Sequence, residues 1–116
     1  MINKIYKSVL ITGASSGIGL ETLKRFFKEK IKIYALDKDI SALEKLKKKY
    51  KFEIIQIDLF DTDQIYKKLT KLNVDIAVCN AGIGRGAEGI LKASRQDIEL
   101  STRLNVESYL HTLKAI

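Results

Sequence analysis

Four short apolar runs rich in β-branched residues occur along this chain, and a longer segment follows each of them. The runs are SVLIT (Ser8–Thr12), IKIYAL (Ile31–Leu36), FEIIQI (Phe52–Ile57) and VDIAVC (Val74–Cys79). Their length and composition predict β-strands. The chain is therefore expected to alternate strands and helices in a βαβαβαβα order.

The segments between the runs carry apolar residues at helical spacing. SALE (41–44) and DTDQ (61–64) have the spacing of capping boxes, which predicts that a helix begins at each. The apolar face after the first run consists of Ile18, Leu23, Phe26 and Phe27, and the face after the third run of Ile65, Leu69 and Leu72.

A glycine-rich loop, Gly82 to Gly89, precedes the last predicted helix. We expect this helix to begin near Ser94 or Asp97 and to run toward Ile116. One side of it would carry Val106, Leu110 and Leu113.

The alternation predicts an α/β fold. Right-handed crossovers favour a parallel sheet with helices on both faces. A complete Rossmann-like, doubly wound sheet has the strand order 3-2-1-4-5-6, so about four strands would form a truncated sheet in the order 3-2-1-4. We expect one domain, residues 1–116. Ligands of such sheets bind at the carboxyl ends of the strands where the strand order reverses, which brings the loops after the first and fourth strands together.

The loop after the first strand is TGASSGIG (Thr12–Gly19). Glycines allow a sharp turn and close approach of the backbone to a ligand, and the following helix presents unpaired N–H groups at its N-terminus. Those donors and the helix dipole favour a phosphate, and a pyrophosphate is the usual occupant of such a loop.

Asp37 ends the second predicted strand, 18 residues after Gly19. A carboxylate there accepts hydrogen bonds from the ribose of an adenosine and repels a 2′-phosphate, so we predict NAD rather than NADP as the cofactor. The alternative interpretation of Asp37 is a turn or helix-cap residue.

The net charge of +7, mostly from lysine, raises the question of a nucleic-acid partner. The densest run, EKLKKKYK (Glu44–Lys51), keeps Leu43, Leu46 and Tyr50 at helical spacing, so its lysines are expected on a solvated helix face. Cations in a last helical turn also complement the helix dipole. We therefore expect no nucleic-acid partner.

The content of 46% hydrophobic and 30% charged residues is typical of soluble globular proteins. The apolar runs are too short to cross a bilayer, and the first residues, MINKIYKSVLI, lack the features of a secretory leader. The single cysteine, Cys79, fits a reducing compartment. We expect a cytoplasmic protein with no membrane partner.

Several segments together resemble the short-chain dehydrogenase/reductase family. Thr12–Gly19 resembles its TGxxxGxG signature, and Asp58-Leu59 its adenine-contacting aspartate. CNAGIG, from Cys79, is similar to the Asn-Asn-Ala-Gly motif, with Cys79 in place of the first asparagine. DIELSTRLNVE (97–107) resembles the helix that brings the active-site asparagine. Each segment alone has a purely structural interpretation; their joint order and spacing, over nearly the whole chain, carry the resemblance.

The resemblance implies binding of a nicotinamide dinucleotide and a catalytic role for Asn105. No metal site is expected, because His111, the only histidine, has no ligand cluster around it in the sequence. The glycine loop, Asp37 and the resemblance together predict the cofactor-binding residues Thr12, Gly13, Ser15, Ser16, Gly17, Ile18, Gly19, Asp37, Asp58, Leu59, Asn80, Ala81 and Gly82.

Members of this family transfer hydride between the nicotinamide and a carbinol or carbonyl carbon, with a Tyr-x-x-x-Lys pair for acid/base chemistry. Tyr34 and Lys38 have this spacing, but they span the end of a predicted strand, where i and i+4 do not share a face. Tyr109 and Lys114 are five positions apart, off a common helical face. The catalytic Ser and the Tyr-x-x-x-Lys pair are therefore expected to be absent from this chain.

We thus expect the dinucleotide-binding half of an oxidoreductase, incomplete at its C-terminus, with an alcohol or carbonyl substrate only if completed. The alternative is a non-catalytic nucleotide-binding module that needs a complementing chain. A fourth strand without a fifth would expose an apolar edge. Self-association or a complementing chain is expected at that edge and along the last helix.

Overall fold

A parallel sheet forms the centre of the computed structural model, which describes residues 2–86 and 88–116. In the described chain it has four strands, in the order β3-β2-β1-β4, as the sequence predicts. The strands are β1 (Ser8–Thr12), β2 (Lys32–Asp37), β3 (Glu53–Gln56) and β4 (Ile76–Val78). Each lies within two residues of a predicted run at both ends.

Strand β1 is the middle of the sheet. It pairs with β2 from Ser8↔Lys32 to Thr12↔Leu36, and with β4 from Val9↔Ile76 to Ile11↔Val78. All five of its residues are buried. Helices on both faces account for this, because a parallel strand covered on both sides has no solvent face.

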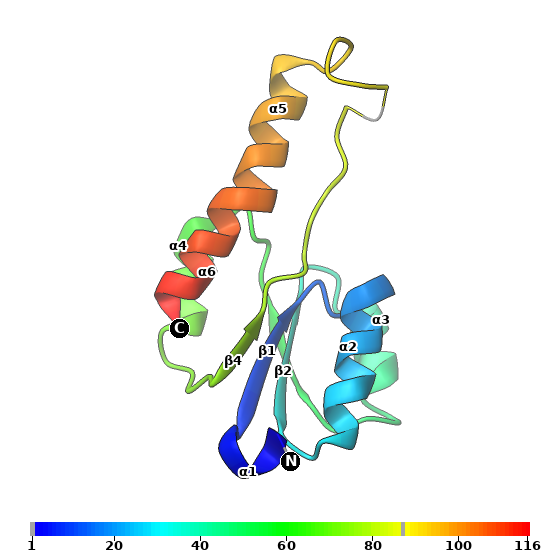
Figure 1. Cartoon of the computed structure of the whole chain (residues 1–116), viewed down its shortest axis with the longest axis vertical. Helices are drawn as coiled ribbons and strands as arrows, with labels where there is room; N and C mark the ends of the chain where they lie inside the picture. Colours follow the sequence, from blue (N-terminus) through cyan, green and yellow to red (C-terminus); the bar gives the residue numbers. More distant parts are fainter. Residues whose placement is uncertain (1, 87) are drawn as a thin grey trace.

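Helices cover the two faces of the sheet as separate groups (Figure 1). Leu23 and Leu43 bring α2 and α3 onto one face, and Ile65 and Leu104 bring α4 and the C-terminal helix onto the other. The helices are α1 (Ile2–Ile5), α2 (Gly17–Lys28), α3 (Ser41–Leu46), α4 (Thr62–Leu69), α5 (Arg95–Thr102), the π-helical turn η1 (Arg103–Glu107) and α6 (Ser108–Ala115).

The lysine-rich helix is shorter than the sequence predicts. α3 ends at Leu46, and the following lysines lie in turns, although Leu46 and Tyr50 still pack against the core. The SALE capping box is also wrong. Ser41 is the first helical residue rather than the cap, and its hydroxyl donates to Asp39 Oδ1 at 2.7 Å. The Ser41 hydroxyl is thus bonded to Asp39, whereas a capping box would need it to accept a hydrogen bond from a helix N–H group.

The other two predicted helix starts are confirmed. Asp61 caps α4 by accepting a hydrogen bond from the Gln64 N–H at 3.2 Å. Ser94 and Asp97 form a reciprocal capping box at the start of α5. Both helices therefore satisfy their own N-terminal donors with side chains.

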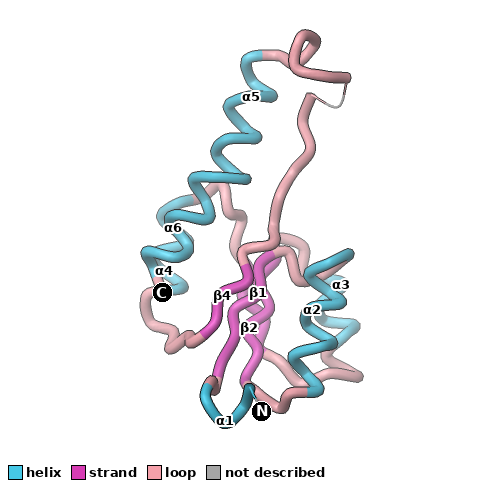
Figure 2. Tube along the Cα trace, viewed as in Figure 1, coloured by secondary structure: helices cyan, strands magenta, loops and turns pink. Residues whose placement is uncertain are grey.

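The C-terminal helix, α5 through α6, extends well beyond the sheet (Figure 1, Figure 2). Its core-facing positions include Leu104 and Ala115. Val106, Leu110 and Leu113 do share a side, but it is the solvent side, where they are 53%, 63% and 53% exposed. Ile18, predicted both on the apolar face of α2 and as a cofactor-binding residue, is 77% exposed. In the part of the chain that the structure describes, no helix is of a length and apolarity to span a bilayer.

Leu23→Ala is expected to destabilise the fold strongly, because Leu23 is fully buried and joins α2 to the sheet. A cavity of this kind costs about 2–5 kcal/mol. Leu110→Ala removes the same atoms from an exposed position and is expected to cost less than about 1 kcal/mol. Urea unfolding of both variants measures the difference. Equal losses would contradict the placement of Leu110 in solvent.

Candidate functional site

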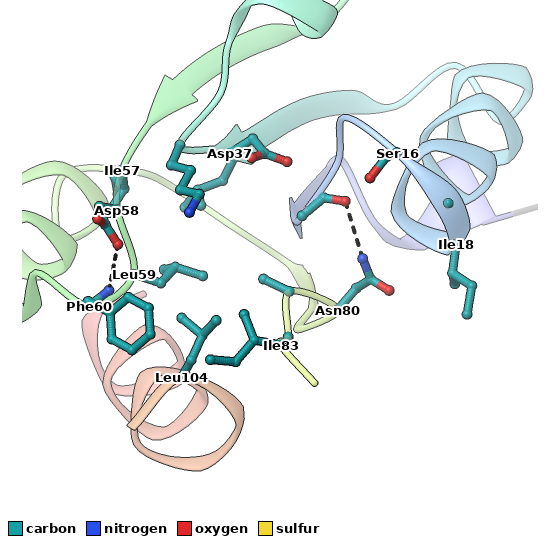
Figure 3. Close-up of a pocket in the computed structure, with 16 residues that line it drawn as sticks. Ser16, Ile18, Asp37, Ile57, Asp58, Leu59, Phe60, Asn80, Ile83 and Leu104 are labelled. Atoms are coloured by element: carbon teal, nitrogen blue, oxygen red, sulfur yellow. Dashed lines mark hydrogen bonds between the residues drawn. The ribbon is translucent and has the colours of Figure 1, made fainter. Parts of the chain in front are cut away.

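A pocket of about 380 Å³ opens at the carboxyl ends of the strands (Figure 3). The loops after β1, β2, β3 and β4 meet there, beside the start of α2. Ten of the thirteen predicted cofactor-binding residues line it: Gly13, Ser16, Gly17, Ile18, Asp37, Asp58, Leu59, Asn80, Ala81 and Gly82.

The loop from β1 to α2 is folded so tightly that it requires glycine. Gly13 has a φ of +63° and Gly17 a φ of +53°, both in the left-handed region that favours glycine. A Cβ on Gly19 would lie 2.0 Å from the Gly13 carbonyl oxygen. The first turn of α2 therefore packs directly against the end of β1.

The N-terminus of α2 is left open. Its cap residue, Ser16, has extended backbone and makes no side-chain capping bond, in contrast to the caps of α4 and α5. The first N–H groups of a helix have no partner within the helix. Those of α2 begin at Gly17 and Ile18, which line the pocket, so they are available to an anionic ligand.

Thr12 fastens the loop after β4 to the end of β1. Its buried hydroxyl oxygen accepts hydrogen bonds from the backbone N–H groups of Asn80 (2.9 Å) and Ala81 (3.0 Å). The Asn80 side chain donates in return to the carbonyls of Thr12 (3.1 Å) and Gly13 (3.3 Å). Thr12 is therefore a residue that shapes the pocket rather than one that lines it.

Asp37 occupies the end of β2 and faces the glycine loop. Its Oδ2 accepts hydrogen bonds from the hydroxyl of Ser15 (2.7 Å) and from the Ser15 N–H (3.2 Å). Its Oδ1 lies 3.3 Å from the Asp39 N–H. Ser15 therefore orients the carboxylate from behind the pocket, while Asp37 and the neighbouring Lys38 line it.

The wall opposite the glycine loop is largely apolar. Figure 3 shows Leu59, Ile83 and Leu104 gathered on this side. Asp58 Oδ1 accepts a hydrogen bond from the Phe60 N–H at 3.0 Å, which fixes the turn after β3. Apolar walls with a few fixed polar groups are the usual lining of a small-molecule site.

Asn105 lies within the π-helical turn η1 and holds the backbone of Ile83. Its Oδ1 accepts from the Ile83 N–H and its Nδ2 donates to the Ile83 carbonyl, both at 2.9 Å. A Cβ on Gly82 would lie 3.1 Å from that same Oδ1. The asparagine thus determines the path of the chain as it leaves β4, and it supports the pocket from outside its lining.

Tyr109 is a supporting residue that the sequence analysis did not identify. Its hydroxyl donates to the Ala81 carbonyl at 2.7 Å. Burial, more than the nearby Cys79, raises the pKa of the phenol, so Tyr109 stays a protonated donor at neutral pH. The sequence feature that could have identified Tyr109 is its position four residues after Asn105, because this spacing places both residues on one helical face.

Tyr34 and Lys38 do not form the helical pair that their spacing would give. Tyr34 is a buried residue of β2 and Lys38 follows that strand, so the two do not share a helical face. His111 lies outside the pocket, where its Nδ1 is 2.9 Å from the Tyr66 hydroxyl. Among residues 2–86 and 88–116 there is no cluster of metal-ligating side chains.

Thr12→Val is expected to destabilise the chain by about 2–4 kcal/mol, because it leaves the N–H groups of Asn80 and Ala81 without an acceptor. Thr102→Val is the control, since the Thr102 hydroxyl makes one exposed bond to a helix carbonyl. Chemical denaturation compares the two. A loss at Thr12 no larger than that at Thr102 would show that this connection does not hold the loops.

The short chain dehydrogenase family model matches residues 7–116 of this chain. An uncharacterised short-chain type dehydrogenase/reductase of Sinorhizobium fredii is 30% identical over 113 residues, covering 94% of this chain and 46% of the relative. An NADP-dependent 3-hydroxy acid dehydrogenase of Escherichia coli is 31% identical, covering 93% of this chain and 46% of its own length.

Solved structures agree with the sequence relatives. The closed form of a serine dehydrogenase complexed with NADP+ superposes with a TM-score of 0.85 at 31% identity, covering 93% of this chain and 46% of that one. A 4-hydroxyisoleucine dehydrogenase mutant complexed with NADH and succinate gives 0.80 at 27% identity, covering 93% and 46%. The chain spans about half the length of the curated relatives it matches. With the sheet order, the open α2 N-terminus and the family match over residues 7–116, the chain belongs to the short-chain dehydrogenase/reductase family.

Proposed function

We propose that this chain is the dinucleotide-binding half of an NAD-dependent oxidoreductase that transfers hydride between the nicotinamide and an alcohol or carbonyl substrate. One observation carries the proposal: the uncapped N-terminus of α2 and the Asp37 carboxylate face a single pocket. That arrangement suits a ligand with a pyrophosphate at one point and a ribose diol at another. The substrate-side chemistry belongs to the whole enzyme.

The pyrophosphate would lie over the glycine loop. The N–H groups at the start of α2 supply donors, and the helix dipole adds a favourable field. No side chain protrudes from Gly13 or Gly17, so the backbone can approach the phosphates closely. Ser16, whose hydroxyl makes no capping bond, is the side-chain donor of this group.

The adenosine would lie across the ends of β2 and β3. Asp37 accepts hydrogen bonds from the ribose hydroxyls in this proposal, and Asp58 and Leu59 border the adenine. When bound, the nicotinamide supplies the hydride acceptor or donor of the reaction. Asn80, Ala81 and Gly82 border the path toward it, and Asn105 is proposed as the active-site asparagine behind that loop.

NAD is proposed over NADP because the Asp37 carboxylate repels a 2′-phosphate. The E. coli relative and the serine dehydrogenase structure are named for NADP, so this chain would differ from them in cofactor choice. Lys38, next in sequence, also lines the pocket and supplies the one cation beside Asp37 among its described lining residues. The balance between these two charges therefore determines the preference.

A second candidate function is a non-catalytic nucleotide-binding module that associates with another polypeptide. The outer edge of β4 has no strand partner in the described part of the chain, and the neighbouring C-terminal helix exposes Leu110 and Leu113. Unpaired strand edges and apolar helix faces bind other chains. We propose the cytoplasm as the location for either function, because the single cysteine suits a reducing compartment.

Gly17→Ala is expected to weaken NADH binding about tenfold, because alanine is disfavoured at the φ of +53° that aims the α2 N–H groups. Gly84→Ala is the matched control: its Cβ would meet open space, and the φ of Gly84 lies outside the left-handed region. Calorimetric titration of the 116-residue chain measures both. Saturable binding that is equal in both variants would contradict the proposed pyrophosphate site.

Asp37→Ala is expected to shift the NADPH-to-NADH affinity ratio toward NADPH by about tenfold or more, since it removes the repulsion and leaves Lys38 to face the phosphate. Ser15→Ala keeps the carboxylate and is expected to shift the ratio less. Competition titrations give the ratios. Tighter binding of NADPH than NADH by the unaltered chain would overturn the NAD assignment.

A further inference from the structure

A second pocket lies at the opposite end of the sheet from the dinucleotide pocket. It has a volume of about 710 Å³ and lies between the end of α2, the turn into β2 and the start of β3. In Figure 1 this is the lower end of the sheet, where α2 ends and β2 begins. None of its lining residues belongs to the site described above.

The floor of this pocket is apolar. Ile31, Ile33 and Phe52 line it and are 8%, 1% and 5% exposed. Phe27 stands at its edge, 37% exposed, and packs edge-to-face against Tyr50 with ring centroids 5.1 Å apart. Phe27, with the exposed edges of Ile31 and Phe52, therefore supplies the apolar surface of this pocket to a ligand.

The rim carries four lysines and one glutamate. Lys32 is neutralised by Glu53, its Nζ lying 2.8 Å from a carboxylate oxygen. Lys28 is in the last turn of α2, where a cation complements the helix dipole. Within residues 2–86 and 88–116, neither Lys30, which directly follows the α2 C-cap, nor Lys51 forms a salt bridge. The rim therefore has a surplus of positive charge.

Lys30 is held in a backbone conformation that disfavours it. Its φ of 57° lies in the left-handed region. Among the non-glycine residues that the structure describes, Lys30 alone has a positive φ. The position follows the end of α2, where glycine is the usual choice because it has no Cβ. A lysine in that place keeps a cation at the rim at a conformational cost.

We propose that this pocket binds the anion of a medium-chain fatty acid. The alkyl chain would lie on Phe27, Ile31 and Phe52, and the carboxylate would remain at the rim beside Lys30 and Lys51. An alkyl chain would cover the exposed face of Phe27, which a compact anion such as phosphate would leave in contact with water. The lysine surplus favours a carboxylate over a neutral alcohol or an alkylammonium. The inference is independent of the proposed dinucleotide function.

Titration of the full chain with decanoate, followed by ¹H–¹⁵N NMR, tests the proposal. We expect saturable shifts at Phe27, Ile31 and Phe52, also with NADH present, and much weaker effects from decanol and decyltrimethylammonium. Lys30→Gly combined with Lys51→Gln should weaken decanoate binding about tenfold. Because Lys30→Gly also relieves the strained backbone, it is expected to raise the melting temperature, which separates lost binding from lost folding.

Lys67→Gln combined with Lys71→Gln is the matched control, since it removes the same charge from the region of α4 on the other face of the sheet. This variant should bind decanoate as the unaltered chain does. Equal weakening in both double variants, equal binding of the alkylammonium, or displacement of decanoate by NADH would each overturn the proposal. Absence of saturable shifts would overturn it as well.

Discussion

The close contact between the end of β1 and the loop after β4 is the constraint on which the site depends. Thr12 accepts two backbone hydrogen bonds from that loop, and Asn80 returns two to the end of β1. The contact is possible because Gly13 and Gly19 have no side chain. A Cβ at either position would collide with the neighbouring loop. These hydrogen bonds thus determine both the floor of the pocket and the position at which α2 begins.

Two residues of the C-terminal helical segment hold the loop after β4 in place. Asn105 holds the backbone of Ile83 and Tyr109 holds the carbonyl of Ala81. Both come from the π-helical turn and the helix after it, which rest on the sheet through Leu104. The pocket is therefore built by segments from both halves of the chain, and loss of the last helix would release its β4 side.

The sequence was sufficient for the elements whose signal is local. The buried strands, the open glycine loop and the Ser94 cap follow from β-branched runs, glycine spacing and capping chemistry. The errors come from tertiary competition. Ser41 bonds to Asp39 instead of capping its helix. Ile18 lies off the buried face of α2 but borders the pocket, where it was predicted as a cofactor-binding residue. The bonds of Tyr109 and Ser15 join segments far apart in the chain, which periodicity does not reveal.

The central claim is that the carboxyl ends of the strands bind a nicotinamide dinucleotide through the glycine loop. Backbone ¹H–¹⁵N NMR during a titration of the chain with NADH tests it most directly, because it locates the ligand residue by residue. The account predicts saturable shifts that are largest at Gly17, Ile18 and Gly19, with smaller ones at Asp37 and Asn80. Shifts confined to other surfaces, or none that saturate, would contradict it.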